Sequence, residues 1–250
     1  MKESAIRLEQ NLNIFPLGDS AITFDLGNSF SIESNLRVRN MQTWLQQDLK
    51  DLPRDVICGY SSVTVLYDPV KVKGKFNSGG TAFEIIRNKL IQAWEATASW
   101  DLNHETELIR IPVCYEAEFG PDLDFVAKTK NLSIPEIIRL HHEKIYYIYL
   151  IGFLPGFSYM AEIDEKLFMP RKMNPVTVAP GSVGISGRQT GIYPLQCPGG
   201  WQILGRTPLK LFDQYLADPV KLRAGQKVQF YPISRDEFDY EWFRENGSAE

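Results

Sequence analysis

The sequence has 250 residues, a formal net charge of −4, and 44% hydrophobic and 12% aromatic residues. This length fits one large domain or two ordinary domains, and the apolar content is ample for a core. Residues 235–250 carry six acidic and two basic side chains, so they account for the whole net charge. The rest of the chain is balanced and shows no basic excess, which argues against a nucleic acid as partner.

Targeting signals and cysteine usage favour a cytoplasmic protein. No apolar run approaches the roughly 20 residues of a membrane helix, and the first residues lack the apolar segment of a secretory signal. The three cysteines, Cys58, Cys114 and Cys197, are odd in number and widely spaced, which argues against a disulfide framework or a zinc site. We expect no membrane partner and three buried, unreactive thiols.

The first elements alternate between strand and helix signals. Residues 11–16 and 20–26 predict two strands because β-favouring side chains flank a Gly-Asp turn. Ser31 is predicted to cap a helix that runs to about Leu52 with apolar residues at helical spacing. Pro53 is expected to close it.

A second set of the same elements follows. Residues 56–60 and 63–67 predict two more strands, and residues 71–80 read as a surface loop. Thr81 and Glu84 form a capping-box pattern at the start of the next helix. The resulting order, ββαββα, predicts a two-layer α/β domain over residues 1–98, followed by a linker at 99–106.

The pattern changes after residue 106. Short apolar runs separated by Gly and Pro predict an antiparallel β-barrel domain over residues 107–234, with a helical insertion near 121–142. Ser133 and Glu136 form a second capping-box pattern within this insertion. Residues 235–250 form an acidic tail whose aromatic residues predict a short docked helix.

The stretch from Ile151 to Arg206 stands out in composition. It holds nine of the 18 glycines, and Arg188 is the only charged residue between Met173 and Gly205. Flexible linkers are normally rich in polar residues and poor in large apolar ones, whereas aromatic residues lie among these glycines. The stretch therefore predicts a rigid, largely uncharged wall that lines a pocket. The alternative is a turn-rich barrel that binds no ligand.

Common catalytic patterns are absent from this stretch. Ser158 and Ser186 lack the final Gly of a nucleophile elbow. The glycines match neither a dinucleotide fingerprint nor a phosphate loop. His141-His142-Glu143 lacks zinc spacing, so we expect no metal site and interpret His141 as a polar surface residue at a helix end. Asp122, near a helix start, is explained by the helix dipole alone.

Three arginines are candidate anion-binding groups. Arg171, Arg188 and Arg206 lie within or beside the low-charge stretch, and a guanidinium there can bind a carboxylate or phosphate through two hydrogen bonds. The alternative is surface placement or a salt bridge at the barrel end.

Several separate motifs, in order, resemble one known family. They are Pro16–Ala21, Ile111–Tyr115, Phe119–Leu123, Gly152–Phe157, Pro170–Lys172, Gly181–Ile185, Gln189–Pro194, Pro198–Trp201 and Gly205–Pro208. The chain is similar to the KipI family, whose members are also called 5-oxoprolinase B subunits, allophanate hydrolase subunit 1, or carboxyltransferase subdomain C and D. The resemblance implies an α+β protein with an N-terminal two-layer α/β (ferredoxin-like) domain and a C-terminal cyclophilin-like antiparallel β-barrel. One departure is Val176, which stands where the family usually has a second Pro-Arg arginine, and this change puts substrate binding in question.

The resemblance implies three candidate functions. The first is a subunit of an ATP-dependent 5-oxoprolinase that opens 5-oxo-L-proline to L-glutamate, together with two partners: a companion cyclophilin-like subunit (the C-type chain) plus an amidohydrolase-like, A-type chain. ATP is then the expected cofactor, bound by this chain or together with the partner subunit. The second is an inhibitor of a sensor histidine kinase. The third is half of a carboxyltransferase that takes biotin from another protein, since no Met-Lys-Met biotin acceptor is present.

Site residues are expected on the pocket wall, and no catalytic residue is assigned. Arg206 or Arg188 is expected to hold an anionic group, with Trp201, Phe157 and Tyr193 as walls. The full set of candidates is Phe153, Pro155, Phe157, Arg171, Ser182, Arg188, Gln189, Tyr193, Gly199, Gly200, Trp201 and Arg206.

Overall fold

The structure is a computed structural model that describes residues 13–27, 30–50, 52–76, 80–101 and 106–246. For residues 243–246 it describes the backbone alone. The chain divides into two compact units, Met1–His104 and Glu105–Glu250. Within the described residues, no helix is both long enough and apolar enough to cross a membrane.

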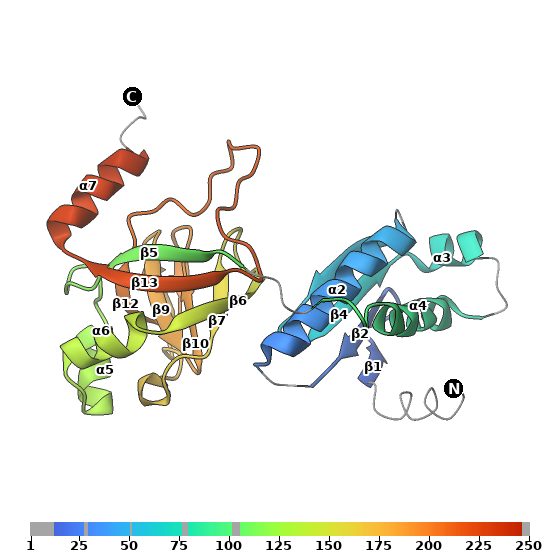
Figure 1. The fold of residues 1–250 in the computed structure, drawn as a ribbon, viewed down its shortest axis with the longest axis horizontal. Coiled ribbons are helices and arrows are strands. Elements are labelled where there is room, and N and C mark those ends of the chain that lie inside the picture. The colour runs from blue at the N-terminus through green and yellow to red at the C-terminus, as the bar shows by residue number, and fades with distance from the viewer. Residues whose placement is uncertain (1–12, 28–29, 51, 77–79, 102–105, 247–250) are drawn as a thin grey trace. The chain divides into compact units, whose positions relative to one another are not determined.

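The first unit is a four-stranded antiparallel sheet covered by helices (Figure 1). The sheet order is β1-β2-β4-β3, and helices α2 and α4 pack on the sheet and on each other. Their buried faces share one apolar core, which includes Phe24, Leu45, Val65 and Leu90. The elements are β1 (Asn13–Pro16), β2 (Ala21–Asp25), α2 (Ile32–Leu49), β3 (Pro53–Cys58), β4 (Ser62–Tyr67), α3 (Pro69–Phe76) and α4 (Ala82–Ala96).

Both predicted helix caps of this unit are confirmed. The Ser31 hydroxyl accepts a hydrogen bond from the backbone N–H of Ser34 at 3.2 Å. Thr81 and Glu84 form a complete capping box, with reciprocal bonds of 3.2 and 2.7 Å. Each bond satisfies a backbone donor that the first helical turn leaves free.

Three local predictions need correction. The segment predicted as a surface loop begins with helix α3, because the Asp68 carboxylate accepts the N–H of Val70 and the side chain of Val72 is buried. The first long helix ends at Leu49, and the following strand already starts at Pro53. The ferredoxin-like arrangement is not confirmed, since that fold runs βαββαβ whereas this unit runs ββαββαα.

The second unit is built on a closed seven-strand barrel. Its strand order is β10-β7-β6-β13-β5-β12-β9. The strands are β5 (Leu108–Cys114), β6 (Ile145–Ile151), β7 (Ser158–Ala161), β9 (Ser182–Ser186), β10 (Gln189–Ile192), β12 (Gln202–Arg206) and β13 (Lys227–Ile233). A two-stranded ribbon, β8 (Val176–Val178) with β11 (Cys197–Gly199), lies beside the barrel sheet.

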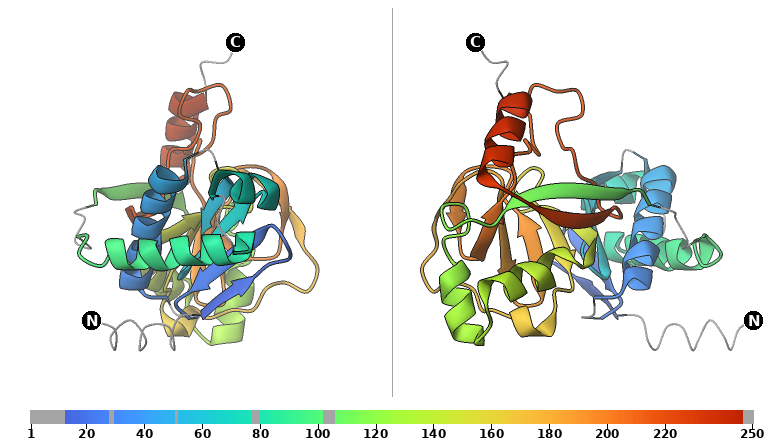
Figure 2. Two further views of the ribbon diagram at one scale, coloured as in Figure 1. Left: turned by 90° about the vertical axis from the view of Figure 1, so that its right-hand side faces the viewer. Right: turned by 60° about the vertical axis from the view of Figure 1, so that its left-hand side comes forward.

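The barrel is not wholly antiparallel as predicted. Strands β5 and β13 pair in parallel, from Lys227 opposite Leu108 to Ile233 opposite Cys114, and Figure 2 shows them side by side. The first and last strands of the barrel are joined by the whole intervening chain, so no hairpin fixes their relative direction.

Helices close the barrel unit. Helices α5 (Leu123–Lys130) and α6 (Ile134–His142) pack on each other, and a 3₁₀ turn, η1 (Glu165–Leu167), contacts both. Helix α7 (Arg235–Asn246) buries Phe238 against Phe119, with ring centroids 4.3 Å apart. The acidic tail therefore contains a helix that is anchored by one aromatic side chain.

His141 is not a surface residue, contrary to the interpretation from sequence. It is fully buried and stacks on Phe230. Its Nε2 lies 2.9 Å from Thr190 Oγ1, and its Nδ1 lies 2.8 Å from the Tyr115 hydroxyl. Thr190 donates its own hydrogen to the carbonyl of Gly184, so Nε2 must donate to Thr190 and Nδ1 must accept from Tyr115. The network is fully satisfied by a neutral imidazole, and burial lowers the pKa of His141 to about 3.

The three thiols are free and differ in burial. Cys114 is buried, whereas Cys58 and Cys197 are half-buried, so the prediction of full burial holds for one of them. Burial raises the pKa of Cys58 to about 12 and also raises the pKa of the other two. All three are therefore poor nucleophiles at neutral pH.

Candidate active site

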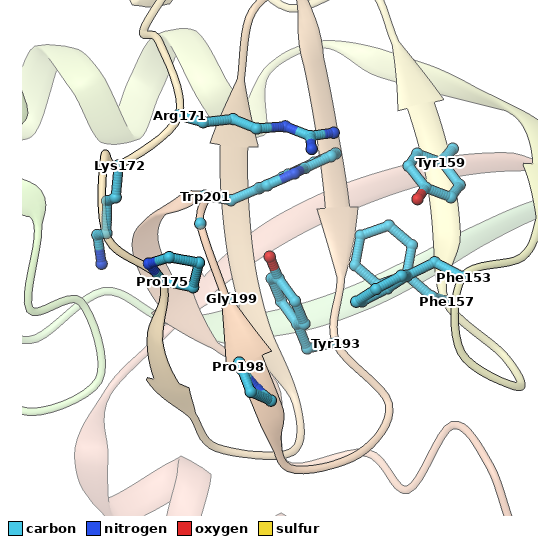
Figure 3. A pocket seen from close by; sticks show the side chains of 11 residues that line it. Phe153, Phe157, Tyr159, Arg171, Lys172, Pro175, Tyr193, Pro198, Gly199 and Trp201 are labelled. Carbon is cyan, nitrogen blue, oxygen red and sulfur yellow. The ribbon is translucent and has the colours of Figure 1, made fainter.

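A pocket of about 240 Å³ opens in the barrel unit (Figure 3). Its walls are mainly aromatic, and its rim carries two basic side chains and several Gly and Pro residues. The lining consists of Phe153, Phe157, Tyr159, Arg171, Lys172, Pro175, Tyr193, Pro198, Gly199, Gly200 and Trp201. We call it the aromatic pocket.

Phe157 is the centre of the aromatic wall and is 1% exposed. Its ring centroid lies 4.6 Å from that of Tyr159, 4.9 Å from Tyr193 and 5.4 Å from Trp201. The Tyr193 and Trp201 rings meet it nearly edge-on, at 80° and 86°, which is a favourable aromatic geometry. Because each ring is held by the others, the wall is preorganised for a ligand.

Two glycines make room for these rings. A Cβ on Gly191 would lie 3.0 and 3.1 Å from ring carbons of Phe157. A Cβ on Gly199 would lie 3.0 Å from the Tyr193 hydroxyl and equally close to Val178. The glycine-rich composition of this stretch therefore reflects close packing behind the wall.

Phe153 forms the exposed edge of the pocket. Its ring meets Phe157 at 88° with centroids 5.7 Å apart, and 64% of the residue is exposed. Its backbone has a φ of +69°, a left-handed conformation that is uncommon for a bulky residue. An exposed phenylalanine on a strained backbone fits a binding surface better than a structural role.

A short strap, residues 170–175, carries the basic side chains over the pocket. The N–H of Lys172 donates to the carbonyl of Gly200 at 2.7 Å, and the Gln202 amide donates to the carbonyl of Pro170 at 3.1 Å. Between these two anchors, Arg171 extends beside the Trp201 ring in Figure 3. In the described part of the chain, its guanidinium has no hydrogen bond or ion pair, so it is free to bind an anion.

Lys172 is fixed by Asp122. Its Nζ lies 2.6 Å from Asp122 Oδ2, the same oxygen that accepts the N–H of Ile203 at 2.6 Å. Asp122 makes no side-chain cap on helix α5. The explanation by helix dipole was therefore incomplete, because the carboxylate joins the strap to the barrel.

Tyr193 supplies the polar group of the pocket wall. Burial is the main cause that raises its pKa to about 12, while the backbone N–H of Trp201, which bonds to the phenol oxygen, and Arg171 act in the opposite direction. The phenol is therefore protonated at neutral pH. A protonated phenol can donate its hydrogen to a ligand.

The other two candidate arginines lie elsewhere. Arg188 pairs with Glu162 at 2.9 Å and Glu165 at 3.7 Å beside a separate cavity, as a barrel-end salt bridge would. Arg206 lines a further cavity together with Ser182. The cation of the aromatic pocket is therefore Arg171, in place of Arg188 or Arg206.

Two further candidates, Pro155 and Gln189, line none of these three cavities. Sequence reasoning also missed four lining residues: Tyr159, Lys172, Pro175 and Pro198. Tyr159 had a usable signal, because it lies two residues after Phe157, and on a strand that spacing places both side chains on the same side. Lys172 gave none, because its position depends on Asp122, which is distant in sequence.

The aromatic pocket offers groups that can bind a ligand. Its lining contains no Ser, Cys, His, Asp or Glu that could act as nucleophile or general base. Across the described ranges, no cluster of His, Cys, Asp or Glu could hold a metal ion. The arrangement can hold a small, flat molecule between aromatic rings, an anionic group on Arg171 and a hydrogen-bond acceptor on Tyr193.

Comparisons with known proteins agree with this picture. The family model "Carboxyltransferase domain, subdomain C and D" matches residues 12–222. The 5-oxoprolinase B subunit of Bacillus subtilis (strain 168) is 37% identical over 236 residues, which cover 93% of this chain and 96% of that protein. That of Haemophilus influenzae is 38% identical over 220 residues, covering 88% and 97%. The crystal structure of PH0987 from Pyrococcus horikoshii is 36% identical, has a TM-score of 0.51, and matches over 90% of this chain and 100% of that one. The chain therefore belongs to the carboxyltransferase subdomain C and D family, together with the 5-oxoprolinase B subunits.

Proposed function

We propose that this chain is the B-type subunit of an ATP-dependent 5-oxoprolinase and that its aromatic pocket binds 5-oxo-L-proline. The observation that carries the proposal is Arg171, which has no ion-pair partner among the described residues, beside a preorganised aromatic wall. The names of relatives that are 37% and 38% identical over most of the chain support it.

The ligand's groups match the pocket's groups one by one. 5-Oxo-L-proline has a small, nearly flat ring, one carboxylate and one lactam carbonyl. The Arg171 guanidinium offers two parallel donors to the carboxylate. The Tyr193 phenol offers its hydrogen to the lactam carbonyl, and the ring lies against Phe157 and Trp201. The volume of about 240 Å³ suits such a ligand and is below the range typical of drug-sized molecules.

The missing chemistry belongs to partner chains. Opening a lactam requires an activated carbonyl and a water activated by a base, and the pocket lining supplies neither. We assign these roles to a companion barrel chain and an amidohydrolase-like chain, with the present chain orienting the substrate. The aromatic pocket is small for ATP and its lining has no phosphate loop, so we place ATP outside this pocket. When bound, ATP supplies the free energy that drives ring opening.

Reconstitution tests this proposal. This chain, the companion barrel chain and the amidohydrolase-like chain are mixed, and ATP turnover is measured with 5-oxo-L-proline. We expect turnover only in the full mixture and expect Arg171→Ala to raise KM at least tenfold, since a charge-assisted bidentate contact is lost. Arg188→Ala is the matched control, because it removes one arginine outside the pocket. Equal KM for the two variants would exclude the assigned role of Arg171, and turnover by this chain alone would exclude the division of labour.

A second function follows from the matched family model. Half of a carboxyltransferase would use the same pocket for a small amide or urea, with carboxybiotin delivered by another protein. This alternative predicts that a biotinylated carrier, and not ATP with 5-oxo-L-proline alone, supports turnover of the reconstituted complex.

A further inference from the structure

A second cavity, of about 210 Å³, lies beside the aromatic pocket and shares Lys172 with it. It lies between the β8 strand of the ribbon, the loop before helix α5 and the ends of barrel strands β9 and β12. Its lining consists of Glu118, Phe119, Pro121, Lys172, Val176, Thr177, Val178, Ala179, Ser182, Ile203 and Arg206. Val176, the residue that departs from the family pattern, belongs to this cavity and is absent from the aromatic pocket's lining.

Arg206 is the unusual residue of this cavity. Its Nε donates to the carbonyl of Pro180 at 2.7 Å, and its guanidinium carbon lies 5.8 Å from the centre of the Phe238 ring. Within the ranges that the structure describes, it has no ion-pair partner. It is half-buried, and this burial lowers its pKa despite the opposing charge of Glu118. A partly desolvated guanidinium without a counter-ion is unfavourable unless a ligand supplies one.

The nearby carboxylates are committed to other cations. Asp122 is bonded to Lys172 and to the N–H of Ile203. Glu118 pairs with Arg235 at 2.7 Å. The positive charge of Arg206 is therefore left facing the cavity without a matching anion from these groups.

Two hydroxyl groups line the same cavity, and Ser182 is the cross-strand neighbour of Arg206 in the pairing of β9 with β12. Ser182 is only 5% exposed, and its hydroxyl has no hydrogen-bond partner in the described part of the chain. The Thr177 hydroxyl is also unbonded there and lines the same cavity. The chain just before Ser182 passes close to Arg206 and Thr207, and this approach requires Gly181. The φ of Gly181 is +82°, and an added Cβ would lie 2.3 Å from the Thr207 carbonyl oxygen.

We propose that this cavity is a second ligand site, which binds a phosphate group through the Arg206 guanidinium and the Ser182 hydroxyl. A forked cation with a hydroxyl beside it, on the neighbouring strand, matches an anion whose oxygens point in several directions. The site is separate from the aromatic pocket and does not depend on the function proposed for it. The phosphate can be free inorganic phosphate or the terminal phosphate of a nucleotide.

Binding of inorganic phosphate to the full chain tests the site. Affinity is measured by isothermal titration and by the shift of the melting temperature, in chloride buffers of matched ionic strength. We expect wild type to bind phosphate and Arg206→Ala to bind at least tenfold more weakly. Arg188→Ala, which also removes one positive charge, is expected to bind phosphate as wild type does.

Two further measurements make the result decisive. Ser182→Ala removes only a hydroxyl and is expected to weaken phosphate binding severalfold, so it replaces Arg206→Ala if that variant does not fold. If ATP competes with inorganic phosphate for the site, and if Arg206→Ala weakens ATP binding as well, the natural ligand is the phosphate of a nucleotide. If ATP does not compete, the ligand is free phosphate. No phosphate-specific binding by wild type, or an equal affinity in wild type, Arg206→Ala and Ser182→Ala, would overturn the proposal.

Discussion

Mild acid should weaken the barrel unit through a single side chain, His141. This residue is fully buried, is bonded at both ring nitrogens, and has its pKa lowered by burial from 6.5 to about 3. A histidine whose folded pKa is depressed stabilises the fold above its unfolded pKa of 6.5. That stabilisation is lost as the pH falls from 6.5 toward 3, because the unfolded chain binds the proton more tightly.

The size of the effect follows from the two pKa values. A shift from 6.5 to about 3 corresponds to about 5 kcal/mol in the acid limit, at roughly 1.4 kcal/mol per pKa unit. By the same linkage relation, the barrel unit should lose about 2 kcal/mol between pH 7 and pH 5 and about 3 kcal/mol by pH 4. The interval from pH 6.5 to 5 is the most informative, since ordinary carboxylates titrate mainly below it.

Urea unfolding between pH 7 and 5 measures this loss. Pulsed hydrogen–deuterium labelling of peptides from β6 and β9 reports on the barrel unit separately from the N-terminal unit. His141→Gln keeps hydrogen-bonding groups at the site but does not titrate, so its unfolding free energy should vary by less than about 0.5 kcal/mol over this range. His142→Gln is the matched control and should keep the full wild-type dependence. An equal pH dependence in wild type and His141→Gln would refute the reasoning.

Three further predictions concern the strap, the pocket and a helix cap. Gly199→Ala should push the Tyr193 hydroxyl out of place and so weaken the binding of 5-oxo-L-proline, measured by titration. Gly74→Ala, whose added Cβ would meet open space, is the control and should leave this binding unchanged. Asp122→Ala should leave Lys172 unpaired and destabilise the barrel unit by about 2 kcal/mol in urea unfolding; a change below about 0.5 kcal/mol would show that the ion pair is not structural. Thr81→Ala should lower the unfolding free energy of the N-terminal unit by about 1 kcal/mol, and Thr81→Ser should restore most of that loss.

The aromatic wall of the site could be predicted, but its cation could not. Phe157, Tyr193 and Trp201 stood out because large apolar residues among glycines indicate packed turns. The three candidate arginines looked alike in sequence, since each lies in or beside the same uncharged stretch. They were separated by partners distant in the chain: Glu162 and Glu165 neutralise Arg188, whereas the strap places Arg171 beside Trp201.

The sequence by itself determined the features that depend on neighbouring residues. The caps at Ser31 and Thr81, the helix and strand periodicities and the turn-rich second half are all set within a few positions along the chain, so local rules predict them. The tertiary structure alone decided the parallel pairing of β5 with β13, the burial of His141 and the bond between Asp122 and Lys172. Each of these joins residues that are at least 26 positions apart, and local composition carries no information about which distant group will neutralise a charge or satisfy a hydrogen bond.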